Sequence, residues 1–297
     1  MAIKSIINFI KTIQEFPRDE GYEYYYRGHS NFNFSLLPSI YRKPKKKKVA
    51  LINNEEKIFR EIIIRTPADF SSEKTTIEKL VKMQHYGLPT RILDITSNPL
   101  VALYFACAQN SENKDGEVVV IKIPKEETKF YDSDTVSVLS NLARRTIDFD
   151  ISEILEEFKE REKHSPDNPD NIMWFNKQEP IPYLLHEIKD EKPQFLPIIY
   201  PSDFNRVLLV RVKLNNNRIL KQSGAFLLFG INNKKSEPAQ VPNSWILNKS
   251  LKDFDFKISN DRKTSILKDL DSLGINDSTL YPELEQQAKY IKQIYEG

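Results

Sequence analysis

The order of strand-like and helix-like segments is the feature that most constrains the fold of this chain. Residues 22–28 and 116–124 are rich in Tyr, Val and Ile, which favour β-strands, and more strand-like segments follow from residue 195 onward. Segments with apolar residues at helical spacing concentrate in the middle of the chain. No internal repeat and no long polar linker divides it. The pattern predicts a single large α+β domain with a central mixed or antiparallel sheet and helical insertions.

The individual elements follow from residue types and their spacing. Helices are predicted at 3–16, 53–65, 71–87, 98–110, twice within 132–162, and at 176–190, 261–275 and 282–297. Strands are predicted at 22–28, 116–124, 195–200, 206–212, 225–230, 244–248 and 254–259, and a polar loop at 163–173. Gly87 is expected to end one helix, Asn53 or Asn54 to cap a second, and Thr96 or Ser97 to cap a third.

Composition limits the classes of protein that the chain can belong to. The net charge of +2 gives no overall electrostatic argument for binding nucleic acid. The single cysteine, Cys107, excludes an internal disulfide framework and a cysteine-based zinc cluster, and favours the reducing cytoplasm. Lys4, Lys11 and Glu15 interrupt the apolar residues of the first helix, which is therefore amphipathic and unlike a signal peptide. No apolar run reaches the roughly 20 residues of a membrane span.

The segment YEYYYRGHSNFNFSLLPSIYR (22–42) places one arginine at the end of an aromatic strand. Arg27 is followed at once by Gly28, in a chain that has only eight glycines and is expected to use them where a side chain cannot fit. The guanidinium of Arg27 either forms a buried structural pair or clamps an anionic ligand. The adjoining basic run 42–48 is either a solvated turn or a patch that contacts phosphate.

The segment MQHYGLPTRILDITSNPLVALYFACA (83–108) has the highest density of polar residues between apolar ones. Thr90, Arg91 and Asp94 lie on an extended stretch between two predicted helices, so their side chains are either paired or face a ligand. Arg91 and Asp94 could form a structural ion pair that holds the turn. Tyr104 lies on an apolar helix, where it is either a core residue or a residue that stacks on a ligand.

Two further polar residues occur near the C-terminal end. Gln222 precedes a predicted strand, where its amide could recognise an amide or a ribose hydroxyl, or could be a turn residue in water. Glu283 and Glu285 lie in the first turn of the last predicted helix, where carboxylates are favoured by the helix dipole. Either could instead steady a sugar oxocarbenium ion.

Several common catalytic motifs do not occur in the sequence. It has no GxGxxG and no GxxxxGK[ST], so ordinary dinucleotide and P-loop sites are not indicated. It has no HExxH, only four histidines, and no GxSxG nucleophile elbow. No metal site is predicted.

In order along the chain, the motifs YRGHS, QHYGLPTRILDITSNPLVALYFA, DSDTVSVLSNLARR, RILKQSGAFLLF and LYPELEQQAKYIK resemble the FRG domain, which takes its name from an aromatic-Arg-Gly motif. The resemblance divides the chain into an N-terminal helix (1–19), the FRG domain (20–230), and C-terminal strands and helices that complete the same domain (231–297). The family usually continues its LPT motif into L-L-D-W, and here Ile92 and Ile95 replace a leucine and the tryptophan.

The order of the motifs also resembles the ADP-ribosyltransferases, which begin with an Arg-Gly or His-Gly strand and end with a Glu, Gln or Asp. That resemblance implies NAD as substrate, with catalytic residues Arg27, Gln222 and Glu283, and with ligand-binding residues Tyr26, Gly28, His29, Tyr86, Thr90, Arg91, Asp94 and Tyr104.

Three functions remain open. The first is an ADP-ribosyltransferase-like or NAD-glycohydrolase toxin or anti-phage defence protein of the bacterial cytoplasm, with a protein or nucleic-acid acceptor and no membrane partner. The second is a non-catalytic module that senses a nucleotide or a phage protein. The third is a protein that acts on nucleic acid through residues 42–48 and the NLARR motif.

Overall fold

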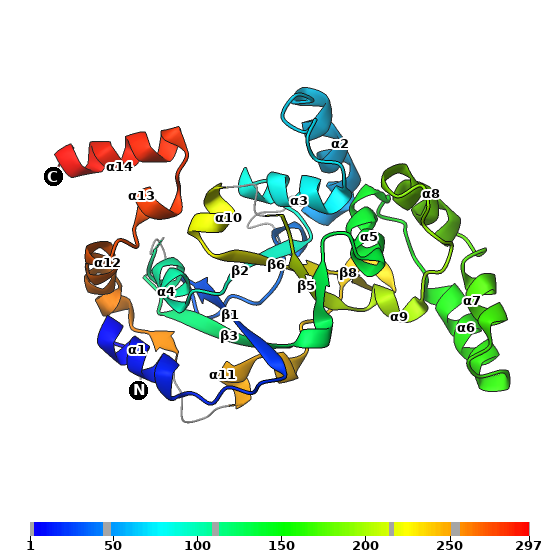
Figure 1. Cartoon of the computed structure of the whole chain (residues 1–297), viewed down its shortest axis with the longest axis horizontal. Helices are drawn as coiled ribbons and strands as arrows, with labels where there is room; N and C mark the ends of the chain where they lie inside the picture. Colours follow the sequence, from blue (N-terminus) through cyan, green and yellow to red (C-terminus); the bar gives the residue numbers. More distant parts are fainter. Residues whose placement is uncertain (1–2, 44–48, 109–112, 214–216, 251–255, 297) are drawn as a thin grey trace.

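A seven-stranded sheet organises the computed structural model, which describes residues 3–43, 49–108, 113–213, 217–250 and 256–296 (Figure 1). Its strand order is β4-β5-β6-β2-β1-β3-β9. Neighbouring strands are antiparallel except for the parallel pair β4–β5, so the sheet is mixed. The strands are β1 Tyr22–His29, β2 Ile92–Thr96, β3 Gly116–Pro124, β4 Thr128–Phe130, β5 Val207–Arg211, β6 Gly224–Phe229 and β9 Lys257–Ile258, and a separate hairpin consists of β7 Ile231–Asn232 and β8 Lys234–Pro238.

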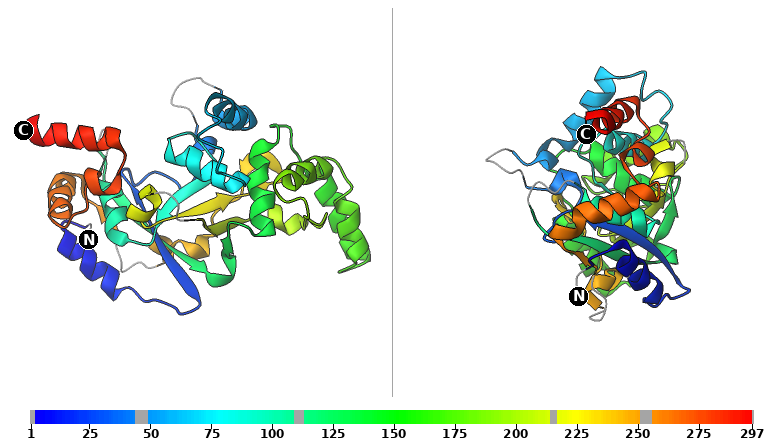
Figure 2. Two further views of the ribbon diagram at one scale, coloured as in Figure 1. Left: turned by 45° about the horizontal axis from the view of Figure 1, so that its top comes forward. Right: turned by 90° about the vertical axis from the view of Figure 1, so that its left-hand side faces the viewer.

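Helices surround this sheet and extend from it at both ends of the elongated molecule. They are α1 Ile6–Glu15, α2 Glu55–Arg65, α3 Thr76–His85, α4 Pro99–Cys107, α5 Asp134–Asn141, α6 Ser152–His164, α7 Pro169–Phe175, α8 Ile181–Glu191, α9 Pro201–Phe204, α10 Asn217–Lys221, α11 Leu247–Ser250, α12 Lys263–Ser272, α13 Asp277–Leu280 and α14 Leu284–Glu296. Figure 2 shows α14 at one end of the molecule and α6 and α7 at the other. Within the described residues, no helix combines the length and apolar character needed to cross a membrane.

Two groups of helices cover one face of the sheet. Helices α1, α4 and α12 pack over β1 and β3, and α3 and α5 pack over β2, β5 and β6, with α8 packed against α5 (Figure 1). The opposite face carries its own apolar layer, to which Trp245 and Ala239 contribute. Alternation along β3 fits this arrangement, since Val118 and Val120 face α4 and its neighbours while Val119 faces Trp245.

Strands β1 and β2 are the weakest junction in the sheet. They share a single paired position, Tyr26 opposite Thr96, whereas β1 pairs with β3 along its whole length. From Arg27 onward β1 continues beside β3 without a ladder to β2. Gly28 lies in this part of β1, and a Cβ there would meet the backbone oxygen of Ala102 at 2.0 Å. The residue has to be glycine because α4 packs directly against the strand.

Most predicted elements are confirmed. Strands β1, β3, β5 and β6 and helices α1 to α4, α8, α12 and α14 occur where the sequence predicts them. The α+β class and the mixed sheet are confirmed as well. Gly87 follows α3 with φ of +80°, which is the left-handed conformation expected of a glycine after a helix.

Other predictions are wrong for local reasons. Residues 195–200 form no strand, and residues 244–248 form the 3₁₀ helix Asn243–Trp245 and the start of α11. The predicted loop 163–173 contains most of α7, whose first turn begins at Pro169 after the Asn168 cap. Asn98, and neither Thr96 nor Ser97, caps α4 by accepting a hydrogen bond from the Leu100 N–H. Part of the predicted strand 254–259 lies outside the described residues.

Candidate functional site

A cavity of about 1150 Å³ is lined by residues of both β1 and β2, near the point where these strands separate. Residues of α3, α4, α10 and β6 and of the loop after β1 complete most of its surface. The remaining surface, called here the C-terminal wall, consists of Leu267, Asp271, Ile275, Asn276, Asp277, Tyr281 and Tyr290. Pockets for small ligands commonly measure about 300–1,000 Å³, so this cavity is large enough for a dinucleotide-sized molecule.

Arginines and a lysine give one side of the cavity a positive charge. Arg27, Arg42, Lys43 and Arg218 all line it. The Arg27 side chain bridges the gap between β1 and β2, because its Nη1 donates to the backbone oxygen of Asp94. Arg42 donates through Nε to the Leu37 oxygen at 3.1 Å. Among the residues that the structure describes, neither Arg27 nor Arg42 has a carboxylate within ion-pair distance.

Burial and mutual repulsion act on these two arginines. Burial lowers the pKa of Arg27 to about 10, Arg42 adds to the lowering, and the charge of Asp94 opposes it. Burial likewise lowers the pKa of Arg42, again against the charge of Asp94. Both guanidinium groups still carry their charge at neutral pH. The site therefore holds two incompletely compensated positive charges.

His29 lies directly beside Arg27 and is neutral. Its side chain is only 3% exposed, and burial together with the charge of Arg27 lowers its pKa to about 3. The Arg27 Nε donates to His29 Nε2 at 3.3 Å, so the ring proton belongs on Nδ1. The buried Nδ1 has no hydrogen-bond partner in the described part of the chain. His29 thus adds no charge to the site and orients the Arg27 guanidinium.

Asp94 reaches the cavity from the central strand β2. It is the one exposed residue of that strand, whose other four residues are buried. Its Oδ2 accepts a hydrogen bond from Gln84 Nε2 at 2.6 Å, and Gln84 Oε1 accepts one from Thr90 Oγ1 at 2.7 Å. Thr90 itself is buried. A fixed chain of side chains therefore supports the Asp94 carboxylate.

The segment from α13 to the start of α14 is tied to three other elements around the cavity. Tyr104 of α4 donates to Asp277, and Gln222 donates through Nε2 to the Leu280 oxygen at 3.1 Å. The His85 ring of α3 forms a hydrogen bond with the Glu283 carboxylate. Gln222 lines the cavity, and its side-chain amide already donates one hydrogen bond to this segment. Glu283 binds His85 and does not line the cavity.

Arg218 and Tyr281 add a further contact between α10 and the C-terminal wall. The Arg218 guanidinium carbon lies 4.6 Å from the centre of the Tyr281 ring, and Arg218 Nη1 donates to the His85 oxygen at 2.9 Å. Tyr281 is also edge-to-face with Phe105, with ring centres 6.4 Å apart. Aromatic faces and a cation therefore occur together on this side of the cavity.

Arg91 belongs to the core and does not line the cavity. It binds Glu55 with two nitrogens, Nε at 3.0 Å from Oε1 and Nη2 against Oε2, and Lys235 Nζ lies 3.1 Å from the same carboxylate. The alternative of an Arg91–Asp94 ion pair is therefore wrong. Burial raises the pKa of Glu55, but the charges of Arg91 and Lys235 outweigh that effect and hold the pKa below its ordinary value.

The remaining residues of the predicted site are divided between the cavity and other places. Tyr26, Gly28, His29 and Tyr104 line the cavity, although Tyr26 is buried and its hydroxyl accepts a hydrogen bond from Arg18 at 3.0 Å. Thr90 lies behind Gln84. Tyr86 is 71% exposed, stacks on His85 and does not line the cavity.

Sequence reasoning did not select several cavity residues, namely Gln84, Arg218, Asp271, Asp277 and Tyr281, and it considered Arg42 only as part of the basic run 42–48. Gln84 offered a signal, since it is a polar residue on the apolar face of α3. Arg42 lies at the start of the basic run, whose residues 44–48 are outside the described part of the chain. No comparable signal distinguishes Arg218 from the many other basic residues.

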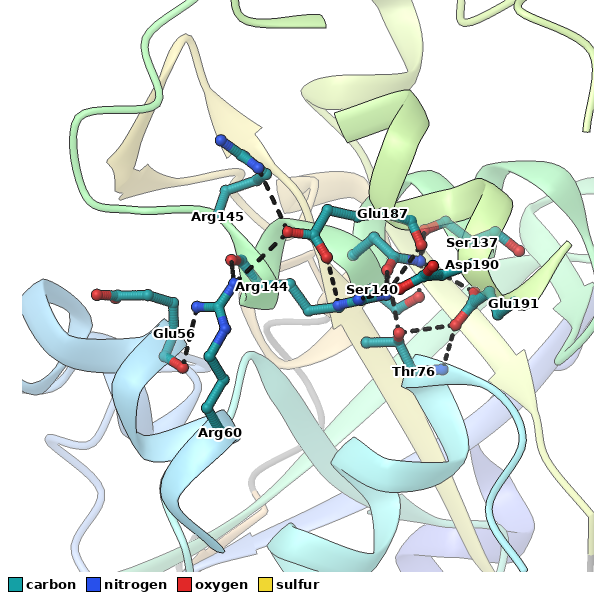
Figure 3. Close-up of polar contacts among 11 residues, drawn as sticks. Glu56, Arg60, Thr76, Ser137, Ser140, Arg144, Arg145, Glu187, Asp190 and Glu191 are labelled. Atoms are coloured by element: carbon teal, nitrogen blue, oxygen red, sulfur yellow. Dashed lines mark hydrogen bonds and ion pairs between the residues drawn. The ribbon is translucent and has the colours of Figure 1, made fainter. Parts of the chain in front are cut away.

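A second polar cluster joins α2, α5 and α8 away from the cavity (Figure 3). Its centre is Glu187, which lies 2.6 Å from Arg144 Nε, 3.4 Å from Arg145 Nη1 and 3.5 Å from Arg60 Nη2. Arg144 also pairs with Asp190 at 2.7 Å. Both arginines of the NLARR motif are therefore used in internal ion pairs, which removes the reason for assigning them to nucleic acid.

Comparison with known proteins identifies one part of the chain. Residues 22–115 match the family model described as the FRG domain. No curated protein and no solved structure matches the chain. The matched residues supply Arg27, Arg42, Gln84, Asp94 and Tyr104, whereas the C-terminal wall comes from outside the match.

Proposed function

We propose that this protein, which carries an FRG domain at residues 22–115, binds a nucleotide of the NAD type in the cavity between β1, β2 and the C-terminal wall. The observation that carries the proposal is the presence of Arg27 and Arg42 in one cavity without a carboxylate partner among the described residues. A bound anion would compensate the charge of both guanidinium groups.

The free nitrogens of the two arginines suit a pyrophosphate. Nη2 of Arg27 and both terminal nitrogens of Arg42 make no hydrogen bond to a described residue. Arg42 can donate two parallel hydrogen bonds to a phosphate group through its two terminal nitrogens, and Arg27 can donate to a phosphate through Nη2. Two such groups in one cavity match a ligand that carries two neighbouring phosphates.

The rest of the cavity offers surfaces for a base and a sugar. Phe34, Phe105 and Tyr281 line it and present aromatic faces or edges to a flat ring. Gln84, Asn276 and Thr96 add neutral polar groups to the lining, and each of them is held by hydrogen bonds within the protein. This combination of cations, aromatic rings and neutral polar groups is what a dinucleotide requires.

We further propose that the bound NAD is cleaved at its nicotinamide glycosidic bond, with transfer of ADP-ribose to water or to a protein or nucleic-acid acceptor. The transition state of this reaction is similar to an oxocarbenium ion, so an enclosed site can accelerate it by orientation and charge complementarity. A role as a toxin or antiviral defence protein in the cytoplasm rests on the family resemblance alone. Growth arrest on expression, relieved by Arg27→Met, would support that role.

A non-catalytic sensor is the second candidate, and the contacts of Gln222 and Glu283 favour it. Gln222 donates to the Leu280 oxygen and Glu283 pairs with His85, so both expected catalytic groups already have partners within the protein. Such a pocket would bind a nucleotide and not turn it over. Single-turnover assays of nicotinamide release distinguish the two candidates.

The decisive experiment measures binding and turnover on the same samples. Calorimetry with NAD, ADP-ribose and inorganic pyrophosphate should give binding to the wild type, and Arg27→Met should weaken all three by about 10- to 100-fold. Arg65→Met is the matched control, because Arg65 is an exposed residue of α2 paired with Glu61. Absence of binding of all three ligands to the folded wild type would refute the proposed function.

A further inference from the structure

We infer that Asp94 is the residue that contacts the sugar of the bound nucleotide, and that Gln84 is its positioning residue. The inference rests on the proposed nucleotide site and assigns the part of the ligand that each wall recognises. It replaces the expectation that Gln222 or Glu283 supplies the group facing the sugar.

Asp94 differs in position from the other carboxylates that line the cavity. Three carboxylates line the cavity within the described residues, Asp94, Asp271 and Asp277. Asp277 accepts the hydroxyl hydrogen of Tyr104, and Asp271 accepts hydrogen bonds from Asn276 at 2.6 Å and from Tyr290 at 3.3 Å. Asp277 therefore ties the C-terminal wall to α4, and Asp271 makes its contacts within that wall. Asp94 lies instead on the central strand β2, close to Arg27.

Hydrogen bonds from neighbouring side chains hold the Asp94 carboxylate in one orientation. The Thr90 hydroxyl donates to Gln84 Oε1, which turns the Gln84 amide so that its Nε2 donates to Asp94 Oδ2. One carboxylate oxygen is thereby fixed, while Oδ1 has no hydrogen-bond partner among the described residues. Because Arg27 is bonded to the backbone oxygen of Asp94, it does not neutralise the carboxylate by a direct ion pair. Asp94 thus presents an oriented acceptor to the cavity.

An oriented carboxylate beside two arginines matches the chemistry of a nucleotide sugar. The arginines would hold the phosphates, and the sugar is the next group along the ligand. A carboxylate accepts hydrogen bonds from vicinal ribose hydroxyls, as acidic residues do in dinucleotide sites. It also favours the positive charge that develops at C1′ when the glycosidic bond breaks.

The cleavage step balances with water as the only co-reactant. The bond between C1′ and the nicotinamide nitrogen breaks, and both of its electrons leave with neutral nicotinamide. Water adds to C1′, and its proton is released to solvent. Asp94 takes no part in this proton transfer and contributes through its hydrogen bond to the sugar.

The test compares ligands that have a sugar with one that has none. Asp94→Asn should weaken ADP-ribose binding by about 10-fold or more, because a charged acceptor is lost. The same substitution should leave pyrophosphate binding unchanged or slightly tighter, because a negative charge near the arginines is removed. Gln84→Met should weaken ADP-ribose binding by about 3- to 10-fold and also leave pyrophosphate binding unchanged.

The outcomes separate this inference from the proposed function. If the wild type binds neither ligand, the nucleotide site itself is wrong and the sugar assignment falls with it. If the wild type binds both ligands and the Asp94→Asn and Gln84→Met variants bind ADP-ribose normally, only the assignment of Asp94 is overturned. Equal weakening of both ligands would also overturn it, because that result indicates a general structural defect. Gln84→Met keeps the test informative should the Asp94 variant not fold.

Discussion

Arginines occur in two polar regions of this molecule, and their partners differ. In the cluster of α2, α5 and α8, Arg144 binds two carboxylates and Arg145 and Arg60 share Glu187 (Figure 3). In the cavity, the partners of Arg27 among the described residues are a histidine nitrogen and a backbone oxygen, and the partner of Arg42 among them is a backbone oxygen. The first arrangement satisfies charge within the fold. The second leaves positive charge without a carboxylate partner among the described residues, which is the feature on which the proposed binding function rests.

The largest expected effect is on the stability of the fold, and it comes from the ion-pair cluster around Glu187. Arg144→Met should lower the free energy of unfolding by about 3 kcal/mol. The substitution removes the shortest ion pair of the mostly buried Glu187 and leaves its longer pairs with Arg145 and Arg60. Urea unfolding at neutral pH measures this. The exposed Arg65→Met should change the unfolding free energy by about 0.5 kcal/mol or less. Equal urea midpoints for Arg144→Met and the wild type would abolish the distinction between the two regions.

The second-largest expected effect is on the affinity for the proposed nucleotide ligand, and it comes from Arg27 in the cavity. Arg27→Met should raise the Kd for ADP-ribose by about 10- to 100-fold, which is about 1.4–2.8 kcal/mol. Its free energy of unfolding should change by less than that of Arg144→Met, since no ion pair is lost. Calorimetry and urea unfolding on the same preparation give both quantities. A variant that loses stability and keeps its affinity would place Arg27 with the structural arginines.

The pH dependence of stability provides a third contrast. The pKa of His29 is about 3 in the folded protein and 6.5 in a model peptide, so below pH 6.5 the unfolded chain binds a proton that the folded chain does not. The free energy of unfolding should therefore fall by about 1.4 kcal/mol per pH unit between pH 6.5 and 4.5. In His29→Gln the contribution of His29 to this pH dependence, about 1.4 kcal/mol per pH unit, should be lost. In Arg144→Met the same contribution should remain. Parallel slopes for His29→Gln and the wild type would contradict the burial of a neutral histidine beside Arg27.

The smallest expected effect concerns Tyr86. Tyr86→Ala should change the free energy of unfolding by about 0.5 kcal/mol or less and should leave nucleotide affinity within about twofold, because the side chain is exposed and lies outside the cavity lining. Thermal unfolding and calorimetry measure the two quantities. A large loss of affinity would mean that the binding surface extends beyond the cavity around Arg27.

Local sequence patterns predict the elements that carry the site. The aromatic strand before Arg27, the glycine after α3 and the apolar helix around Tyr104 each have a short-range signal, and all three occur as predicted. Arg27, Asp94, Tyr104 and Gln222 also line a single cavity. Gln222 lies between α10 and β6 and Arg27 lies near the end of β1, whereas Asp94 and Tyr104 are polar residues within the apolar elements β2 and α4.

Partners that are distant in sequence could not be predicted in this way. Arg91, the residue before β2, pairs with Glu55 at the start of α2, and Asp94, although only three residues from Arg91, lines the cavity. Glu283 likewise pairs with His85, almost two hundred residues earlier. Charge and spacing identify groups that need a partner, but the packing of helices on the sheet decides which partner each one obtains.

The C-terminal wall has a consequence for the synthesis of the protein. During translation Arg27 leaves the ribosome early, whereas Tyr281 and Tyr290 leave it only after more than two hundred further residues have been added. At about 5–20 residues per second the delay is on the order of tens of seconds. During that time the nascent chain has its arginines and lacks the closing side of the cavity. The cavity is therefore completed only after α13 and the first part of α14 have left the ribosome.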